Sequence, residues 1–192
     1  MMAYLPSRRA LAVLCGWMLA LLALTACAPQ LVGLPEHTGL VVLEAEIERE
    51  GILGLGSTNY VQTAVLDGLP QAHTGQSFGK YVVFSNLEPG EYTFRSMSYS
   101  SSDGVRTYTT TYTVSAAHLA QVPQLKLQVA PGHPAYVGKF KVFAKKTFTE
   151  SELKVSYESD PALEKQAWTK MLAEYKASPW AQPIQQRLDE LK

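Results

Sequence analysis

The stretch Phe84-Ser-Asn-Leu-Glu-Pro-Gly-Glu-Tyr-Thr-Phe94 joins two runs of apolar and aromatic residues through a proline–glycine pair. Pro89 presets the φ angle that the second residue of a tight turn requires, and Gly90 can supply the positive φ of the third residue of a type II turn. The stretch therefore predicts two strands that reverse direction at Pro89-Gly90. It also places the aromatic side chains of Tyr92 and Phe94 on one face of the second strand.

Regular alternation of apolar and polar residues recurs along most of the chain. From Leu40 to Arg49, apolar side chains alternate with Glu44, Glu46 and Glu48, which predicts a half-buried strand with a solvated acidic face. The polar stretch around His73 is expected to be a loop. We expect further strands over residues 60–67, 80–84, 92–100, 105–115, 125–129, 135–145 and 148–157. About seven or eight short strands with frequent turns favour a mainly β fold, an antiparallel β-sandwich.

The sequence Leu87-Glu-Pro-Gly90, followed by a strand that begins at Tyr92, resembles the carboxypeptidase regulatory-like, transthyretin-like β-sandwich family. In that family a strand, a Leu-x-Pro-Gly turn and a Tyr-led strand recur. A second stretch, from Pro131 to Phe140, resembles one that is common in bacterial β-sandwich lipoproteins. The resemblance implies a β-sandwich, and because such folds serve many functions it implies no activity.

The hairpin expected at Asp103-Gly104 poses a question of strand register. A two-residue loop there would place Tyr92 and Phe94 on the opposite face from Tyr108 and Tyr112, so both aromatic pairs could not lie in the core. We expect a bulge or a longer loop to shift the register and bring both pairs inward. The alternative is that one aromatic pair is exposed.

The strand expected over residues 135–145 follows the turn Pro131-Gly-His-Pro134. Its alternation predicts one buried face with aromatic and aliphatic side chains and one solvated face with lysines. The inward set is Tyr136, Phe140 and Val142, and the outward set is Lys139, Lys141 and Lys145.

The chain changes to a helical period near its C-terminus. Asp160-Pro161 is typical of a helix N-cap followed by proline at the first helical position. Ser178-Pro179 ends this helix, and a shorter one is expected from Pro183, with Ile184, Leu188 and Leu191 on one side. The first helix carries a wide apolar stripe of Leu163, Ala167, Trp168, Met171, Leu172 and Tyr175. Because a stripe this wide is costly to leave in water, we expect the helices to be packed on the sandwich.

The N-terminus carries Arg8 and Arg9, then an apolar run that ends in Leu24-Thr-Ala-Cys27. The 16 residues from Leu11 to Ala26 are fewer than the roughly 20 needed to span a bilayer as a helix. The pattern resembles a bacterial lipoprotein signal with a lipobox. The resemblance implies that cleavage falls between Ala26 and Cys27, and that Cys27 carries a diacylglyceryl group on its sulfur.

The resemblance also implies where the chain is divided and where in the cell it is located. It implies a signal peptide over residues 1–26 and a lipidated tether over 27–38, and the strand and helix patterns above predict a β-sandwich over 39–158 and packed helices over 159–192. Ala28 stands where the family has Asp in lipoproteins retained at the inner membrane, so the implied location is the periplasmic face of the outer membrane. Export by the general secretory route is favoured, while Arg8-Arg9 partly resembles a twin-arginine signal and leaves that route open.

Composition and motif spacing narrow the classes of function. Removal of Arg8 and Arg9 leaves a slight acidic excess, and a nucleic-acid partner would favour a basic face. Cys15 leaves with the signal, so no cysteine metal site or disulfide framework is expected. The four histidines, His37, His73, His118 and His133, lack metal-ligand spacing, so we expect neither a metal nor a cofactor.

No motif points to a nucleophile or to a phosphate loop, because Gly51 to Gly56 lacks the lysine that would follow it. Tyr99, Tyr108 and Tyr112, if exposed, would form an aromatic shelf suited to sugar rings or a protein partner, although core packing is favoured. The sequence therefore predicts a non-catalytic accessory or interaction module of the envelope, held to membrane lipid through Cys27 and with a protein partner. The alternatives are a carbohydrate- or cell-wall-binding lipoprotein and an assembly lipoprotein of a type VI-like secretion system.

Overall fold

The computed structural model describes residues 33–50, 56–68, 70–102, 105–146 and 151–192. The predicted signal, the lipobox, tether residues 27–32, the glycine-rich loop over 51–55 and Asp103-Gly104 lie outside the described residues.

The strands are β1 (Gly39–Glu50), β2 (Gly56–Tyr60), β3 (Thr63–Gly68), β4 (His73–Phe78), β5 (Tyr81–Leu87), β6 (Gly90–Ser102), β7 (Thr107–Thr113), β8 (Lys126–Val129), β9 (Pro134–Lys146) and β10 (Ser151–Glu158). The helices are α2 (Ala116–Gln121), the 3-10 turn η1 (Pro123–Leu125), α3 (Pro161–Glu174) and α4 (Ala181–Glu190). The predicted mainly β class with C-terminal helices is confirmed.

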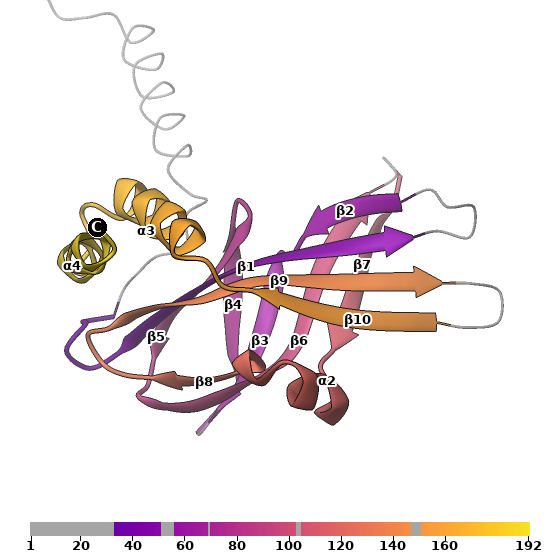
Figure 1. Cartoon of the computed structure of the whole chain (residues 1–192), viewed down its shortest axis with the longest axis horizontal. Coiled ribbons are helices and arrows are strands. Elements are labelled where there is room, and N and C mark those ends of the chain that lie inside the picture. Colours follow the sequence, from indigo (N-terminus) through magenta and orange to yellow (C-terminus); the bar gives the residue numbers. More distant parts are fainter. Residues whose placement is uncertain (1–32, 51–55, 69, 103–104, 147–150) are drawn as a thin grey trace, which may run out of the picture.

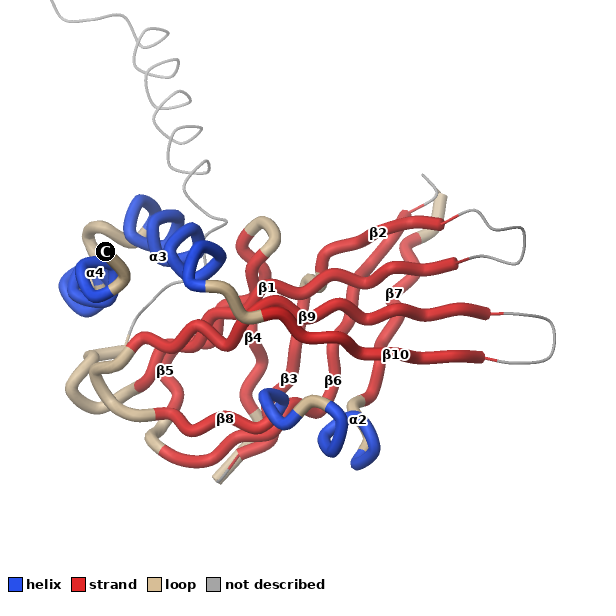
Figure 2. The backbone as a smooth tube through the Cα atoms, in the orientation of Figure 1, coloured by secondary structure: helices blue, strands red, loops and turns tan. Residues whose placement is uncertain are grey.

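Ten strands form one curled, mixed sheet (Figure 1, Figure 2). Its main path runs β10-β9-β1-β5-β4-β3-β6-β7, with β2 paired to β1 and β8 paired to β6. Among the described strands, the pairs are antiparallel except β1 and β9, which run parallel. The antiparallel β-sandwich predicted from the sequence did not include this parallel pair. Parallel pairing suits a strand covered on both faces, and β1 is buried from Gly39 to Ile47.

The segment from Leu87 to Gly90 is a corner and does not join two paired strands. β5 pairs with β1 and β4, whereas β6 pairs with β3, β7 and β8. The φ of Gly90 is 158°, far from the value near +80° that a type II turn requires, and the left-handed residue is Asn86 (62°), so the predicted type II turn is wrong. The Tyr92 hydroxyl donates to the Glu88 carbonyl at 2.8 Å, which ties the corner four residues back along the chain. Tyr92 is buried with Phe94, as predicted.

The polar stretch around His73 is strand β4, and the expectation of a loop was wrong. Gly75 in this strand is buried because the ring of Phe84 on β5 lies against it. A Cβ atom at this position would lie 2.7 Å from ring carbons of Phe84. This close approach and the pairing with β3 and β5 hold β4 in the sheet. Neither can be recognised from the alternation of apolar and polar residues in the strand itself.

A bulge in β6 shifts the register as expected and turns Tyr112 inward, whereas Tyr108 stays 49% exposed. Ser96 lies opposite Val65 and Phe94 opposite Leu66, so Arg95 is the extra residue on β6. After the bulge, Met97 and Tyr99 are buried on the face that Phe94 occupies before it. The facing residue Tyr112 of β7 is partly buried and packs against the same cluster.

A second bulge, in β9, overturns the predicted direction of Tyr136. Val42 lies opposite Tyr136 and Glu44 opposite Lys139, so β9 has one residue more than β1 in this interval. Gly138 occupies it with a φ of 119°, and a Cβ there would lie 2.5 Å from the Tyr157 ring. Tyr136 therefore lies on the outer face of the sheet, while Phe140 and Val142 point inward as expected.

Two apolar clusters cover the two faces of the sheet. The inner cluster fills the curl and contains the inward side chains of β1, from Val41 to Ile47. The outer cluster combines Leu40 and Val42 of β1 with the apolar side chains of α3 and α4. Trp168 and Met171 are completely buried and Leu172 is partly buried, so the expected packing of the helices is confirmed. The remaining members of the outer cluster on the helices and the loop between them are Ala167, Tyr175, Trp180, Ile184 and Leu188.

Candidate functional site

A polar cleft lies where the first residues of β9 meet the C-terminal helices. It has a volume of about 340 Å³ and is lined by Pro134, Tyr136, Glu164, Gln186, Arg187 and Glu190, among others. The β9 side follows the turn at Gly132, whose N–H donates to the Thr38 carbonyl at 3.2 Å. The cleft therefore lies beside the point where the described chain enters the domain.

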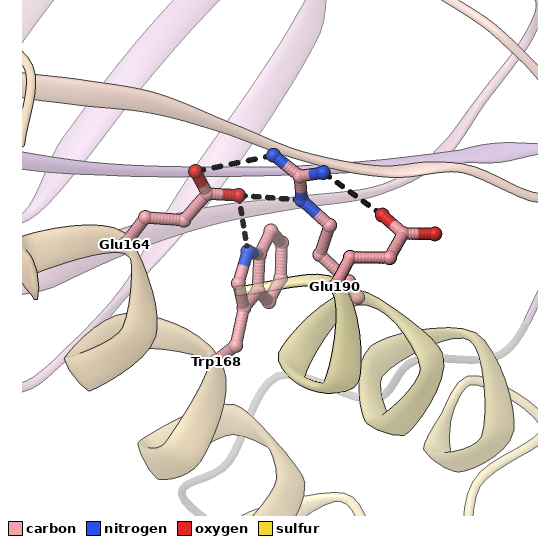
Figure 3. Close-up of polar contacts among 4 residues, drawn as sticks. Glu164, Trp168 and Glu190 are labelled. Atoms are coloured by element: carbon pink, nitrogen blue, oxygen red, sulfur yellow. Dashed lines mark hydrogen bonds and ion pairs between the residues drawn. The ribbon is translucent and has the colours of Figure 1, made fainter. Parts of the chain in front are cut away.

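An arginine on α4 joins the two helices at one wall of this cleft. The Arg187 guanidinium donates through Nε to Glu164 at 2.7 Å and through Nη2 to the second carboxylate oxygen at 3.3 Å. Its Nη1 donates to Glu190 at 2.9 Å, and the Trp168 indole donates to Glu164 at 3.0 Å (Figure 3). These bonds, first to Glu164 and then to Glu190, raise the pKa of Arg187 above its ordinary value. A two-point arginine–carboxylate contact fixes the angle between the helices as well as their distance.

Tyr136 provides an aromatic side chain on the sheet side of the cleft. Its hydroxyl oxygen is buried and has no hydrogen-bond partner among the described residues. Burial, with a smaller effect from Glu44, raises the pKa of this hydroxyl well above its usual range, so the group is a neutral donor. Because this oxygen is closed to solvent, Tyr136 contributes no hydroxyl to the cleft, and the polar side chains that a ligand could reach are those of Gln186, Arg187 and Glu190.

A chain of ion pairs continues the outer face of β1 beyond the cleft. Glu44 lies 2.7 Å from the ammonium of Lys80 and 3.2 Å from that of Lys139. Glu46 lies 3.2 Å from Lys139 and 3.3 Å from Lys141. The exposed fractions of Glu44 and Glu46 are only 2% and 7%, so the predicted solvated acidic face is wrong at these two residues. Lysines directly opposite on β9 compensate the carboxylates, because Glu44 faces Lys139 and Glu46 faces Lys141 in the ladder.

The three tyrosines considered as a ligand shelf do not lie together on the surface. Tyr99 is 1% exposed, and its hydroxyl accepts a hydrogen bond of 2.8 Å from Arg49. Tyr112 packs against the inner cluster, and burial raises its pKa. Tyr108 is 49% exposed. Core packing, which the sequence favoured, therefore accounts for two of the three.

The described histidines have separate structural settings. His118 closes the N-terminus of α2, where Ser115 and His118 form reciprocal capping hydrogen bonds. His73 packs edge-on against Tyr92 with ring centroids 5.6 Å apart, while His37 and His133 are exposed. Among the described residues, no group of three or more His, Cys, Asp or Glu side chains is arranged to hold a metal ion.

Sequence reasoning did not identify the cleft, since Tyr136, Glu164 and Arg187 come together only through tertiary packing. The one local signal was Gly138, because an isolated glycine inside a strand pattern often marks a bulge. Cys27 and Ala26, the predicted lipidation and cleavage residues, lie outside the described residues. No helix in the described part of the chain has the length and apolar character needed to cross a membrane.

Comparison with known proteins gives little further information. No family model matches the chain, and no curated protein matches it. Among solved structures, it is similar to the crystal structure of a "putative carbohydrate binding protein" from Pseudomonas aeruginosa, with 14% sequence identity over 62% of this chain and 92% of that one. The TM-score is 0.29, at which the likeness carries no argument about fold or function.

Proposed function

We propose that the chain is a non-catalytic, lipid-anchored interaction module at the periplasmic face of the outer membrane, where it acts with a protein partner. The observation that carries the proposal is Leu24-Thr-Ala-Cys27 at the end of an apolar run, a short tether ahead of β1. A non-catalytic role is supported by the use of polar groups in the fold. His118 caps a helix, and Glu164 holds Arg187 and Trp168.

The mass of the membrane-bound chain tests the anchor. The mature protein should begin at Cys27 and carry the added mass of its acyl chains, because more than one chain is needed for stable anchoring. Cys27→Ser should accumulate as the uncleaved precursor. Cys15→Ser is the matched control, since it changes the other cysteine within the apolar run and should be processed normally. Normal cleavage and membrane attachment of Cys27→Ser would contradict the proposal.

A second candidate function is recognition of a cell-wall saccharide in the polar cleft. The specific observation is a cleft of about 340 Å³ that is lined by Tyr136 and by the polar side chains of Gln186, Arg187 and Glu190. Saccharides are bound by aromatic rings together with amide, carboxylate and guanidinium groups that exchange hydrogen bonds with sugar hydroxyls. The volume is within the range of small-molecule sites.

Calorimetric titration of the full chain with a soluble peptidoglycan disaccharide fragment tests this candidate. Gln186→Ala removes the hydrogen bonds of an exposed side chain in the cleft and should weaken binding by roughly threefold to tenfold. Gln128→Ala is the matched control, because Gln128 is an exposed glutamine on β8 and does not line the cleft; it should bind like the wild type. Absence of binding, or equal affinity of Gln186→Ala and the wild type, would exclude saccharide recognition in this cleft.

A further inference from the structure

Strand β7 (Thr107–Thr113) ends the main path of the sheet, and no strand of the described residues pairs with its outer side. Its sequence, Thr-Tyr-Thr-Thr-Thr-Tyr-Thr, contains no charge, proline or glycine. Five of its seven residues are exposed. Long uncharged edges of this kind are the ones to which another strand adds, because their outer backbone N–H and C=O groups lack ladder partners.

Two hydrogen bonds establish which backbone groups of β7 face outward. The Val114 N–H donates to the Arg95 carbonyl at 2.8 Å, so residue 114 bonds toward β6, and residues two apart along β7 do the same. On the other side of β6, the Gln62 N–H donates to the Ser98 carbonyl at 2.9 Å. The backbone of Ser98 therefore bonds away from β7, as expected because successive residues of a strand bond to opposite neighbours. The outer edge of β7 therefore carries the N–H and C=O groups of Thr107, Thr109, Thr111 and Thr113.

The sequence of β7 reads the same in both directions about Thr110. In an antiparallel pairing of two copies centred there, Thr109 of one copy lies opposite Thr111 of the other, and Thr107 lies opposite Thr113. These are the residues whose backbone groups face outward, so each such pair can exchange two hydrogen bonds. The same register sets tyrosine opposite tyrosine and threonine opposite threonine, both favourable cross-strand pairs.

We propose that the partner at this edge is a second copy of the chain, bound through antiparallel β7–β7 pairing about Thr110. The palindrome is what a two-fold interface needs, since such an interface is self-complementary. The other free edges in the described part of the sheet are less suited. β10 carries Lys154 and Glu158, β8 carries Lys126, and β2 has only five residues.

Disulfide cross-linking of the full chain in membranes tests this register. Thr110→Cys places two cysteines in a non-hydrogen-bonded antiparallel pair, whose Cα atoms lie about 4.5 Å apart and can form a disulfide. Under mild oxidation it should run as a covalent dimer. Thr111→Cys should not, because residue 111 faces residue 109 of the other copy. Ser156→Cys, exposed on the opposite edge strand β10, controls for random collision, and the unmodified chain sets the background from Cys15 and Cys27.

Edge variants then separate a specific pair from chance contact. Thr111→Pro removes an outward N–H while leaving the ladder to β6 intact, and in combination with Thr110→Cys it should abolish the covalent dimer. Thr111→Lys introduces a charge at the edge; combined with Thr110→Cys it should also abolish the covalent dimer, and it replaces the proline variant if that one does not fold. Thr111→Val, combined with Thr110→Cys in the same way, should retain the dimer. Cross-linking of Thr110→Cys no greater than that of Ser156→Cys, or an undiminished dimer in both edge variants, would overturn the proposal.

Discussion

The outer face of β1 is buried by two different means along one strand. At its start, Leu40 and Val42 lie beneath the apolar side chains of α3 and α4. From Glu44 onward, the same face carries carboxylates that are buried by lysines from β9 and from the turn before β5. The outer residues of β1 are apolar where the helices cover the sheet and charged where lysines cover it. Apolar side chains favour a cover that excludes water, whereas carboxylates require partners with opposite charge.

Loss of the central side chain of the helical cover should have the largest effect on stability. Trp168 is completely buried in the outer cluster, so Trp168→Ala leaves a cavity and should lower the free energy of unfolding by roughly 3–5 kcal/mol. Urea unfolding of the full chain measures it. Lys165→Ala, on the exposed side of the same helix, should change stability by no more than about 0.5 kcal/mol. Equal effects of the two substitutions would show that α3 does not form part of the core.

The ion-paired half of β1 should be less sensitive. Glu44→Gln keeps the size of the side chain but removes the charge shared by Lys80 and Lys139, and should cost about 1.5–3 kcal/mol in the same urea experiment. Glu91→Gln, on an exposed position of β6, is the matched control and should have little effect. If Glu44→Gln were as stable as wild type, the carboxylate would contribute nothing to this half of the sheet.

The contact between the helices should be weaker again. Arg187→Met removes both hydrogen bonds to Glu164, but 37% of the Arg187 side chain is exposed to solvent that screens the pair. The expected loss is about 1 kcal/mol. Lys192→Met breaks the more exposed pair with Asp189 and should have no measurable effect on the free energy of unfolding. If Arg187→Met lowered the free energy of unfolding no more than Lys192→Met does, the contact between Arg187 and Glu164 would not stabilise the fold.

The smallest effect is expected in the pH dependence of the charged half. Burial alone would lower the pKa of Lys139, but hydrogen bonds to Glu44 and Glu46 outweigh it and raise the pKa. A raised lysine pKa stabilises the fold fully below the unfolded-state value near 10.4, and this stabilisation is lost as the pH rises through the folded-state value. Lys139→Arg remains charged, so as the pH rises above about 10.4 it should retain stability that the wild type loses. Parallel declines in the two proteins would exclude Lys139 as the source.

The sequence predicts the strands well but not which way their side chains face after a bulge. Alternation located β1, β6 and β9, and Asp160, whose carboxylate accepts from the Ala162 N–H at 2.7 Å, marked the start of α3. The direction of Tyr136 was missed because Gly138 adds one residue to β9 and reverses the alternation before it. The burial of Glu44 was missed because it depends on lysines brought alongside by pairing across the sheet. These features arise from tertiary contacts, so a local pattern cannot contain them.

Native-state hydrogen exchange on the full chain tests the central claim, that the C-terminal helices are a fixed part of the domain. Amides in the middle of α3, near Trp168 and Met171, should exchange only through the same global unfolding as those of β1 near Leu43. Their free energies of exchange and their dependence on urea should then coincide. Exchange of the α3 amides through a smaller opening, with β1 still protected, would show instead that the helices are a detachable arm.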